Sequence, residues 1–231
     1  MSRILIEVIV QTVDDAVAAE EGGADRLEVV RAIGEGGLTP TLSVVNAIKE
    51  ATSLPLRVMV RGNAGFETSD AEIEILRAAA WNFTKLGVDG LVVGFAKSGK
   101  LSLPEFAGVI EAAPGVPITF HRAFDSVADP LGAIDALAAD PRVDHILTSG
   151  GEGSTSERRG RLQQYVARAG SRVTILAGGG VDVEMFRLLV EQRTVREIHV
   201  GRIAREEGNA EGPVSVASVR RLRDLADGLA R

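Results

Sequence analysis

The chain has 231 residues, of which 45% are hydrophobic and none is cysteine, and its formal net charge is -6. A chain of this length buries a sizeable core without help from disulfides or metal, and the absence of cysteine excludes thiolate catalysis and Cys-type zinc or copper sites. The negative charge, with lysine and arginine mostly dispersed, argues against nucleic acid as a partner.

Neither a membrane span nor a signal segment is indicated by the sequence. No apolar run approaches the roughly 18 residues of a membrane span, and the N-terminus leads directly into a predicted strand. We therefore expect a cytoplasmic protein without a membrane partner. Two basic clusters, 158–161 and 220–223, fall on predicted helices, where we expect them to form solvated faces.

One β/α repeat accounts for nearly the whole chain. Short runs rich in Val, Ile and Leu predict strands at 4–10, 25–30, 56–61, 89–94, 116–121, 143–149, 173–178 and 197–201. Between them, apolar residues recur at spacings of three and four, which predicts helices at 13–21, 41–51, 69–86, 104–113, 130–139, 156–169, 183–192 and 216–229. Asp129 and Asp182 are predicted N-caps, and Gly22-Gly23 and Gly87 predict helix ends.

Eight β/α units with no segment left over predict one domain spanning 1–231, an α/β fold of the (β/α)8 TIM-barrel type. A doubly wound open sheet is the competing topology, but it seldom needs eight regular units.

The alternation of side chains along the strands places a polar set inside the barrel. The inward positions near the carboxyl ends of strands are Glu7, Glu28, Arg61, His121 and His199. A buried charge costs desolvation unless it is paired or solvated in a cavity, so their convergence indicates a functional pocket. Each one alone could equally be a satisfied interior residue, and His145, early in its strand, is expected to be structural.

Two glycine-bearing turns add a second signal. The 178–180 glycine run leads into a predicted helix, and Gly201-Arg202 follows the last strand. Many barrels bind phosphate at these turns through backbone N–H groups, which favours an anion or phosphate subsite. The alternative is that the glycines only permit tight turns.

Four local strings carry a family resemblance. They are GADRLE at 23–28, EGGLTP at 35–40, TFHRAFD at 119–125 and ILTSGG at 146–151, and in order and spacing they resemble the CutC family. The resemblance implies a cytoplasmic TIM barrel, commonly a homodimer, assigned by name to copper homeostasis and sometimes to copper binding. The polar barrel-mouth residues of the family match Glu7, Glu28, Arg61, His121, Arg122 and Asp125.

The chain departs from the family pattern where soft metal ligands are concerned. Many relatives have a cysteine pair where this sequence has Val8-Ile9, and a further cysteine at the position of Val29. Because Cu(I) prefers thiolate and thioether ligands, a tight Cu(I) site is hard to build with Met59 as the one sulfur predicted to face the pocket. Imidazoles and carboxylates could take Cu(II) or Zn(II), yet His121 and His199 lie on different strands and need not meet, so the metal ligands stay unassigned.

Three functions are compatible with these residues. The first is a copper-homeostasis protein that binds copper weakly. The second is an acid/base enzyme, of isomerase, epimerase or lyase type, acting on a small anionic or phosphorylated sugar-like metabolite, with copper or another divalent metal as a potential cofactor. The third is a noncatalytic binding protein, which would be signalled by inward polar residues consumed by mutual salt bridges with no cavity.

The candidate site residues are the same for the first two functions. In the enzyme hypothesis Glu7 or Glu28 is the general base, His121 is the acid or electrophile, and Arg61 with Arg122 holds an anionic oxygen. Asp125 either orients His121 or Arg122 or caps the next helix, and the 35–41 loop is either a lid or a structural turn. The catalytic candidates are Glu7, Glu28, Arg61, His121 and Asp125, and the substrate-binding candidates are Arg122, Ser149, Gly179, His199, Gly201 and Arg202.

Overall fold

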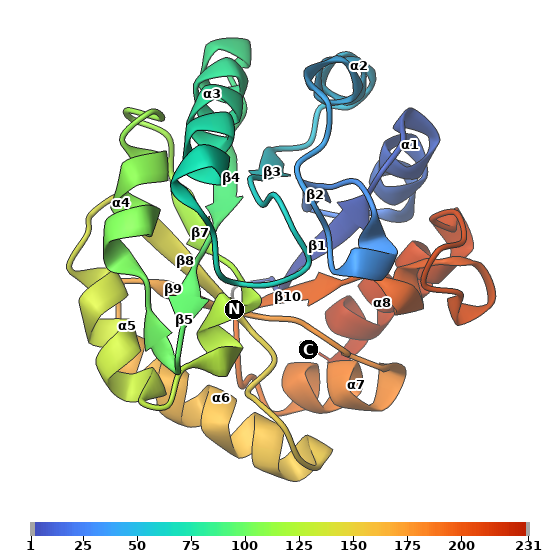
Figure 1. Ribbon diagram of the computed structural model, residues 1–231. Helices are drawn as coiled ribbons and strands as arrows, with labels where there is room; N and C mark the ends of the chain where they lie inside the picture. Colours follow the sequence, from blue (N-terminus) through green and yellow to red (C-terminus); the bar gives the residue numbers. More distant parts are fainter. Residues whose placement is uncertain (1–2, 230–231) are drawn as a thin grey trace.

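Eight parallel strands close into a barrel, and eight α-helices surround it, in the computed structural model, which describes residues 3–229 (Figure 1). The strands are β1 (Leu5–Val10), β2 (Arg26–Val29), β3 (Leu56–Met59), β4 (Gly90–Val93), β7 (Ile118–Phe120), β8 (Val143–Thr148), β9 (Thr174–Ala177) and β10 (Glu197–Val200). The helices are α1 (Val13–Gly22), α2 (Leu42–Ala51), α3 (Asp70–Leu86), α4 (Leu103–Ile110), α5 (Pro130–Ala138), α6 (Thr155–Ala169), α7 (Val183–Glu191) and α8 (Val216–Leu229). The predicted TIM barrel is confirmed.

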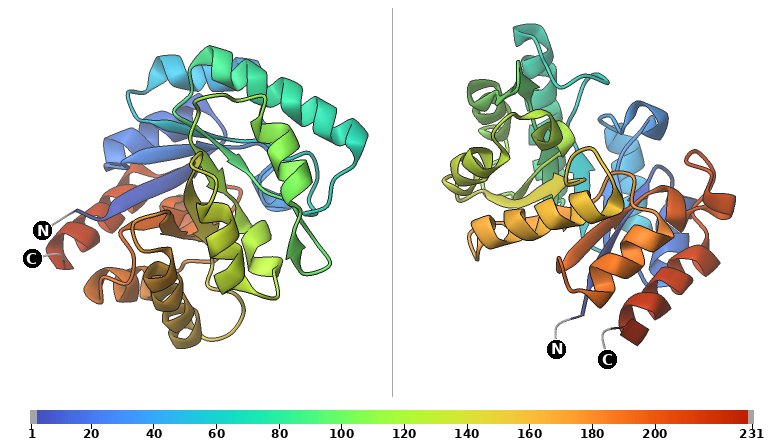
Figure 2. Two further views of the ribbon diagram at one scale, coloured as in Figure 1. Left: turned by 90° about the vertical axis from the view of Figure 1, so that its left-hand side faces the viewer. Right: turned by 90° about the horizontal axis from the view of Figure 1, so that it is seen from below.

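Pairing of the first strand with the last closes the barrel and excludes the open doubly wound sheet. The strand order is β1-β10-β9-β8-β7-β4-β3-β2, with β1 hydrogen-bonded to both β10 and β2. Helices α1 and α8 consequently lie side by side where the chain closes on itself (Figure 2). None of the described helices is long and apolar enough to cross a membrane.

The helix boundaries follow the cap residues that the sequence predicts. The side chains of Asp129 and Asp182 accept hydrogen bonds from the first turns of α5 and α7. Gly23 and Gly87 end α1 and α3 with positive φ angles, a conformation that glycine adopts without steric cost. Gly22, by contrast, is the last residue inside α1.

Differences from the sequence prediction are confined to the ends of elements and to the loops. Several strands are shorter than predicted, because backbone pairing stops where the chain turns into a loop; β7, for example, ends at Phe120 and a 3-10 turn, η2 (Arg122–Ser126), begins two residues later. A small antiparallel hairpin of β5 (Ala96–Lys97) and β6 (Lys100–Leu101) was not expected. Helix α4 ends at Ile110, three residues early.

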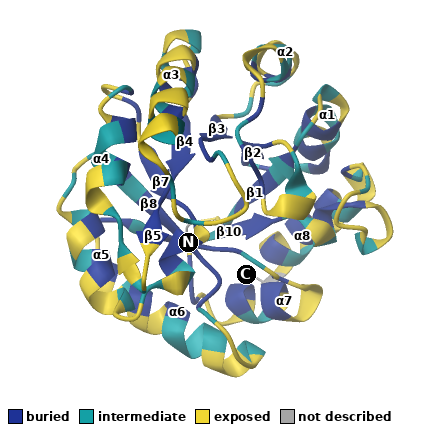
Figure 3. Cartoon of the chain, viewed as in Figure 1, coloured by how far each residue is buried: buried dark blue, intermediate teal, exposed yellow. Residues whose placement is uncertain are grey.

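The apolar core lies between the strands and the helices. The outward side chains of β1, which are Ile6, Val8 and Val10, are fully buried against the helix layer. Figure 3 shows buried strands and buried inward helix faces, with exposed residues gathered on the outer surface. The opposite, inward face of the strands is where the polar residues lie.

The two basic clusters are solvated only in part: Arg220 and Arg221 are exposed, as predicted, whereas other arginines of the clusters bond to neighbouring groups. Arg158 and Arg161 of α6 donate hydrogen bonds to backbone carbonyls of the loops beside them. Arg223 of α8 is 5% exposed and donates to the Ile4 carbonyl and the Asp25 carboxylate. Arginine can do this because a long apolar stem carries several donors in a fixed planar fork.

Charged side chains of alternating sign form a continuous column inside the barrel. We call this set the charge column; it consists of Glu28, His199, Glu7, Arg26, Glu197, His145, Asp144 and Arg57. Strand register builds its centre, because Glu7 of β1 is in register with Arg26 of β2 on one side and with His199 of β10 on the other. The Glu7 carboxylate bonds to both of these neighbours.

The part of the charge column from Arg26 to Arg57 extends toward the amino-terminal ends of the barrel strands. Arg26 Nη2 donates to Glu197 Oε2 at 2.7 Å, and the same oxygen lies 3.0 Å from His145 Nε2. Burial opposes the charged form of His145, but ion pairing with Asp144 and Glu197 outweighs it and raises the pKa of this imidazole. His145 therefore lies among structural ion pairs, away from the carboxyl ends of the strands.

We expect replacement of Glu7 by glutamine to lower the free energy of unfolding by about 3–5 kcal/mol, because Arg26 and His199 would then share a buried site without their counter-charge. Urea denaturation of the wild type and of the Glu7→Gln variant measures the difference in unfolding free energy. The exposed Glu35 is a matched control, and Glu35→Gln should change stability by less than about 0.5 kcal/mol. Equal stabilities of the two variants would show that the column contributes nothing at this point.

Candidate functional site

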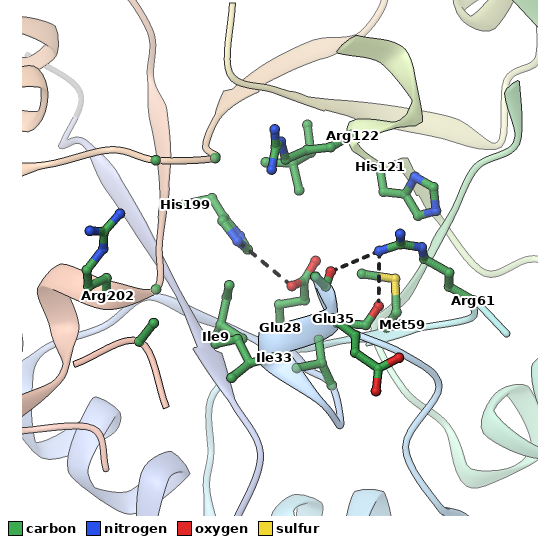
Figure 4. Close-up of a pocket in the computed structure, with 18 of the residues that line it drawn as sticks. Ile9, Glu28, Ile33, Glu35, Met59, Arg61, His121, Arg122, His199 and Arg202 are labelled. Atoms are coloured by element: carbon green, nitrogen blue, oxygen red, sulfur yellow. Dashed lines mark hydrogen bonds and ion pairs between the residues drawn. The ribbon is translucent and has the colours of Figure 1, made fainter. Parts of the chain in front are cut away.

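A cavity of about 380 Å³ lies at the carboxyl ends of the barrel strands (Figure 4). Eight of the predicted site residues line it: Glu28, Arg61, His121, Arg122, Gly179, His199, Gly201 and Arg202. Three others, Glu7, Asp125 and Ser149, do not line it: Glu7 and Asp125 bond to the lining residues His199 and Arg122, and Ser149 bonds to Asp125. Met59 faces the cavity, as the strand alternation predicts.

Glu28 is a carboxylate placed against an apolar wall. It is 2% exposed, near the end of β2, and the cavity lining includes the apolar residues Val30, Met59, Ile9 and Ile33, which form a small hydrophobic cluster with the buried Val92. Burial, reinforced by the nearby Glu7 charge, raises the pKa of Glu28 to about 7 despite the opposing charge of His199. Oε1 of Glu28 has no hydrogen-bond partner among the described residues.

His199 joins Glu28 to the charge column. Its Nδ1 lies 2.7 Å from Glu7 Oε1, and its Nε2 lies 3.8 Å from Glu28 Oε2. Burial disfavours the imidazolium, but the Glu28 charge and the hydrogen bond to Glu7 raise the pKa of His199 above its ordinary value. Although burial also opposes ionisation of Glu7, the Arg26 charge and the His199 hydrogen bond hold the pKa of Glu7 far below its usual range.

His121 is a neutral imidazole in the lining of the cavity. Its Nδ1 accepts the backbone N–H of Ala123 at 3.1 Å, so the neutral ring must carry its proton on Nε2. Burial, followed by the charge of Arg61, lowers the pKa of His121 to about 3. The ring is 3% exposed, packs near Phe66 and Phe120, and its Nε2 has no partner in the described part of the chain.

Arg61 lines the cavity, but its donors are committed to the loops above it. Nε donates to the Gly65 carbonyl, Nη1 to the Gly36 and Gly37 carbonyls, and Nη2 to the Ala64 carbonyl. Four of its five N–H groups are thus used in joining the loop after β2 to the loop after β3. Arg61 was expected to hold a substrate anion; it lines the cavity, but most of its donors bond to the 35–41 loop and to the loop after β3.

Asp125 is a positioning residue for Arg122. Its carboxylate accepts Arg122 Nε at 3.0 Å and also bonds to the Thr148 hydroxyl and to the backbone N–H and hydroxyl of Ser149. The helix that follows is capped by Asp129 instead, so of the two roles expected for Asp125 the structure supports orientation, and the residue that it orients is Arg122 rather than His121.

The glycine turn after β9 makes room for two functional side chains. A Cβ at Gly178 would lie 2.8 Å from the His199 Cβ, and one at Gly179 would collide with the Arg122 guanidinium. The turn is held from outside by Arg158, which donates to the Gly179 and Gly180 carbonyls. Sequence reasoning missed Arg158 and Phe66, because side chains that act on loops leave no periodic signal.

The residues present do not fit a Cu(I) ion. Among the described residues, one group of potential ligands is compact, with atoms of Glu7, Glu28 and His199 all within 4.8 Å of one another. Both Glu7 oxygens already bond to Arg26 and His199, which leaves Glu28 and His199 Nε2. Met59 has the one sulfur in the described lining of the cavity, and a single thioether with hard oxygen donors is not a Cu(I) ligand set.

A closed eight-stranded barrel with an acid–base cavity at the carboxyl ends of its strands defines a TIM-barrel protein with its site in the position usual for that fold. The chain belongs to the CutC family, whose model matches residues 4–204. It is 34% identical to the human copper homeostasis protein cutC homolog over 88% of this chain and 76% of that protein. A CutC family protein from Xanthomonas campestris is 35% identical over 91% and 85% of the two chains.

Solved structures agree with this assignment. The crystal structure of a Streptococcus agalactiae protein assigned to copper homeostasis and CutC matches with a TM-score of 0.78 and 26% identity, over 85% of this chain and 97% of that chain. A tryptophan synthase alpha subunit from Legionella pneumophila matches with a TM-score of 0.67 at 15% identity, over 97% and 93% of the chains, and so shares the fold alone.

Replacement of His121 by glutamine should remove an acid-dependent loss of stability. The depressed pKa of His121 means that, between its folded and unfolded values, only the unfolded chain binds the proton, so its contribution to stability falls as the pH falls. We expect the unfolding free energy of the wild type, relative to His121→Gln, to fall by about 1.4 kcal/mol per pH unit from about pH 6 to about pH 4.

His145→Gln provides a control of opposite sign. The raised pKa of His145 stabilises the folded state below the ordinary histidine pKa, and this contribution is lost as the pH rises through the folded value. Denaturant titrations at several pH values measure both slopes. Parallel stability curves for the wild type and His121→Gln would contradict a neutral His121.

Proposed function

We propose that this protein is an acid/base enzyme that transfers a proton at a carbon beside a carbonyl group of a small anionic metabolite, in an isomerase, epimerase or lyase type of reaction. The observation that carries the proposal is that Glu28 and His121 line one cavity, and that Glu28 Oε1 and His121 Nε2 are buried atoms with no partner in the described part of the chain. Unsatisfied buried polar atoms are costly, and a ligand with a C–H acid and a carbonyl oxygen satisfies both.

The two residues divide the chemistry between them. Glu28, with a pKa near 7, is a base that is both substantially ionised and strong enough to accept a carbon-bound proton. Neutral His121 donates its Nε2–H to the carbonyl oxygen and stabilises the enolate that forms. The described lining contains no Ser, Thr, Cys or Lys, so proton transfer is better supported than nucleophilic catalysis.

The noncatalytic alternative has less support. A vestigial pocket would have its inward polar residues consumed by mutual salt bridges and no cavity. The charge column meets that description from Glu7 to Arg57, but Glu28 and His121 line a cavity and each has a buried atom without a partner among the described residues.

Binding of a divalent copper ion is the second candidate function, favoured by the compact group of Glu7, Glu28 and His199 and by the names of the relatives. In this proposal Glu28 and His199 Nε2 would hold Cu(II), and Glu7 would orient the imidazole through Nδ1. A cation there would occupy the carboxylate that the enzyme hypothesis uses as its base.

We further propose a homodimer in the cytoplasm, as the family resemblance implies.

Replacement of Glu28 by glutamine should abolish proton transfer. The assay incubates the protein in deuterated water with a panel of small hydroxycarbonyl compounds that bear a carboxylate or phosphate group, and follows loss of the carbon-bound proton by NMR. We expect Glu28→Gln to slow exchange about a hundredfold or more, as removal of a general base does. In the wild type, kcat/KM should rise with pH up to about 7 and then level off, since the ionised base is the active form.

Glu35→Gln is the matched control for this assay, because Glu35 lies on the same cavity but is exposed. It should change the exchange rate by less than about threefold. Exchange that persists in Glu28→Gln, or a wild type that exchanges no compound of the panel, would sink the proposal.

Copper titration should separate the oxidation states. In a competition titration of untagged protein, we expect no stoichiometric retention of Cu(I), because no thiolate is present. If the second candidate function holds, Cu(II) should bind in the wild type and in Glu35→Gln but not in Glu28→Gln. Stoichiometric Cu(I) retention would contradict the ligand assignment.

A further inference from the structure

The free hydrogen-bond donors of the cavity are concentrated on one side, where Arg122 lies against the glycine turn after β9. Among the described residues, the one bond of the Arg122 side chain is from Nε to Asp125, and the side chain is 49% exposed. Both terminal NH2 groups are therefore available, in contrast to those of Arg61, which follows β3 two strands away in the barrel. Arg202 also lines the cavity and is exposed.

The orientation of the glycine turn adds backbone donors to this side. Arg158 binds the Gly179 carbonyl at 2.7 Å and the Gly180 carbonyl at 3.3 Å from outside the cavity. All peptide bonds described here are trans, and in a planar trans peptide the N–H points opposite to the C=O. The N–H groups of Gly180 and Val181 consequently point away from Arg158, and both residues line the cavity. Successive backbone N–H groups of this kind form an anion-binding concavity.

Charge and donor number indicate which anion fits. The two NH2 groups of Arg122 would saturate a planar carboxylate alone, whereas the three terminal oxygens of a phosphate can also accept the Gly180 and Val181 N–H groups. Asp125, the carboxylate nearest to Arg122, is already occupied by Thr148 and Ser149. Glu28 and His121 line the same cavity, and each has a buried side-chain atom without a partner in the described part of the chain, so a ligand is expected there on independent grounds.

We infer that the substrate is a phosphate monoester whose phosphoryl group binds Arg122 and the Gly180 and Val181 N–H groups, with Arg158 acting as a positioning residue that holds the turn in its binding orientation. This inference rests on the proposed function, since it names the substrate class of the same cavity. It places the reacting carbon between Glu28 of β2 and His121 after β7, and the anionic group between Arg122 and the glycine turn after β9.

The test is isothermal titration of untagged protein with inorganic phosphate at constant ionic strength, with acetate as the comparison anion. We expect saturable one-to-one phosphate binding and weaker acetate binding. Arg122→Gln, at a half-exposed position, should weaken phosphate binding by about tenfold or more, the effect of losing a charged hydrogen-bond donor.

Arg158→Met tests the turn orientation, and Arg159→Met is its matched control on the same helix, because the structure gives no partner to the Arg159 side chain among the described residues. We expect the first to weaken phosphate binding several-fold and the second to leave it within about twofold. Circular dichroism shows that each variant is folded. Absence of saturable phosphate binding in the wild type, or unchanged binding in Arg122→Gln, overturns the inference.

Glu28→Gln separates this inference from the proposed function. It should bind phosphate at least as tightly as the wild type, since a nearby negative charge is removed, while losing proton exchange. Exchange without phosphate binding would refute the phosphate assignment and leave the acid/base proposal standing. Phosphate binding without proton exchange in any compound of the panel would refute the acid/base proposal and leave the phosphate assignment standing.

Discussion

A charged side chain buried inside this barrel must be paired, and the charge column provides that pairing with residues of opposite charge. Parallel strands covered by helices leave no bulk water at their inner face, so an isolated ion there would be prohibitively costly. Closure of β1 onto β10 and β2 places Glu7 between Arg26 and His199, and pairing continues from there to Arg57. The interior of the barrel is thus a row in which carboxylates alternate with arginine or histidine side chains.

The site is the place where this pairing ends. Glu28 is the last member of the charge column, and it faces His199 at 3.8 Å on one side and an apolar wall on the other. It is therefore less stabilised as an anion than Glu7, which has two close partners. Two carboxylates on neighbouring strands acquire opposite pKa shifts for this reason, and only the one with the raised pKa lines the cavity.

Three arginines around the cavity show how differently one residue type can be used. Arg61 donates hydrogen bonds to backbone carbonyls and so joins two loops, while Arg158 bonds to the glycine turn from outside the cavity. Arg122 is held through Nε by Asp125 and keeps its other donors. Residue type and strand position do not distinguish these uses, because the difference lies in which carbonyl groups the loops bring within reach of each guanidinium.

The sequence by itself determined the eight β/α units, the helix caps at Asp129 and Asp182, and the inward position of Glu28, His121 and His199, because these follow from local periodicity and the chemistry of short segments. It could not decide which inward group is satisfied, since that depends on strand register across barrel closure and on loop carbonyls from distant segments. Only the tertiary structure showed that Glu7 lies behind the cavity and bonds to His199, and that the donors of Arg61 bond to loop carbonyls. It also showed that Glu28 Oε1 and His121 Nε2 have no partner among the described residues.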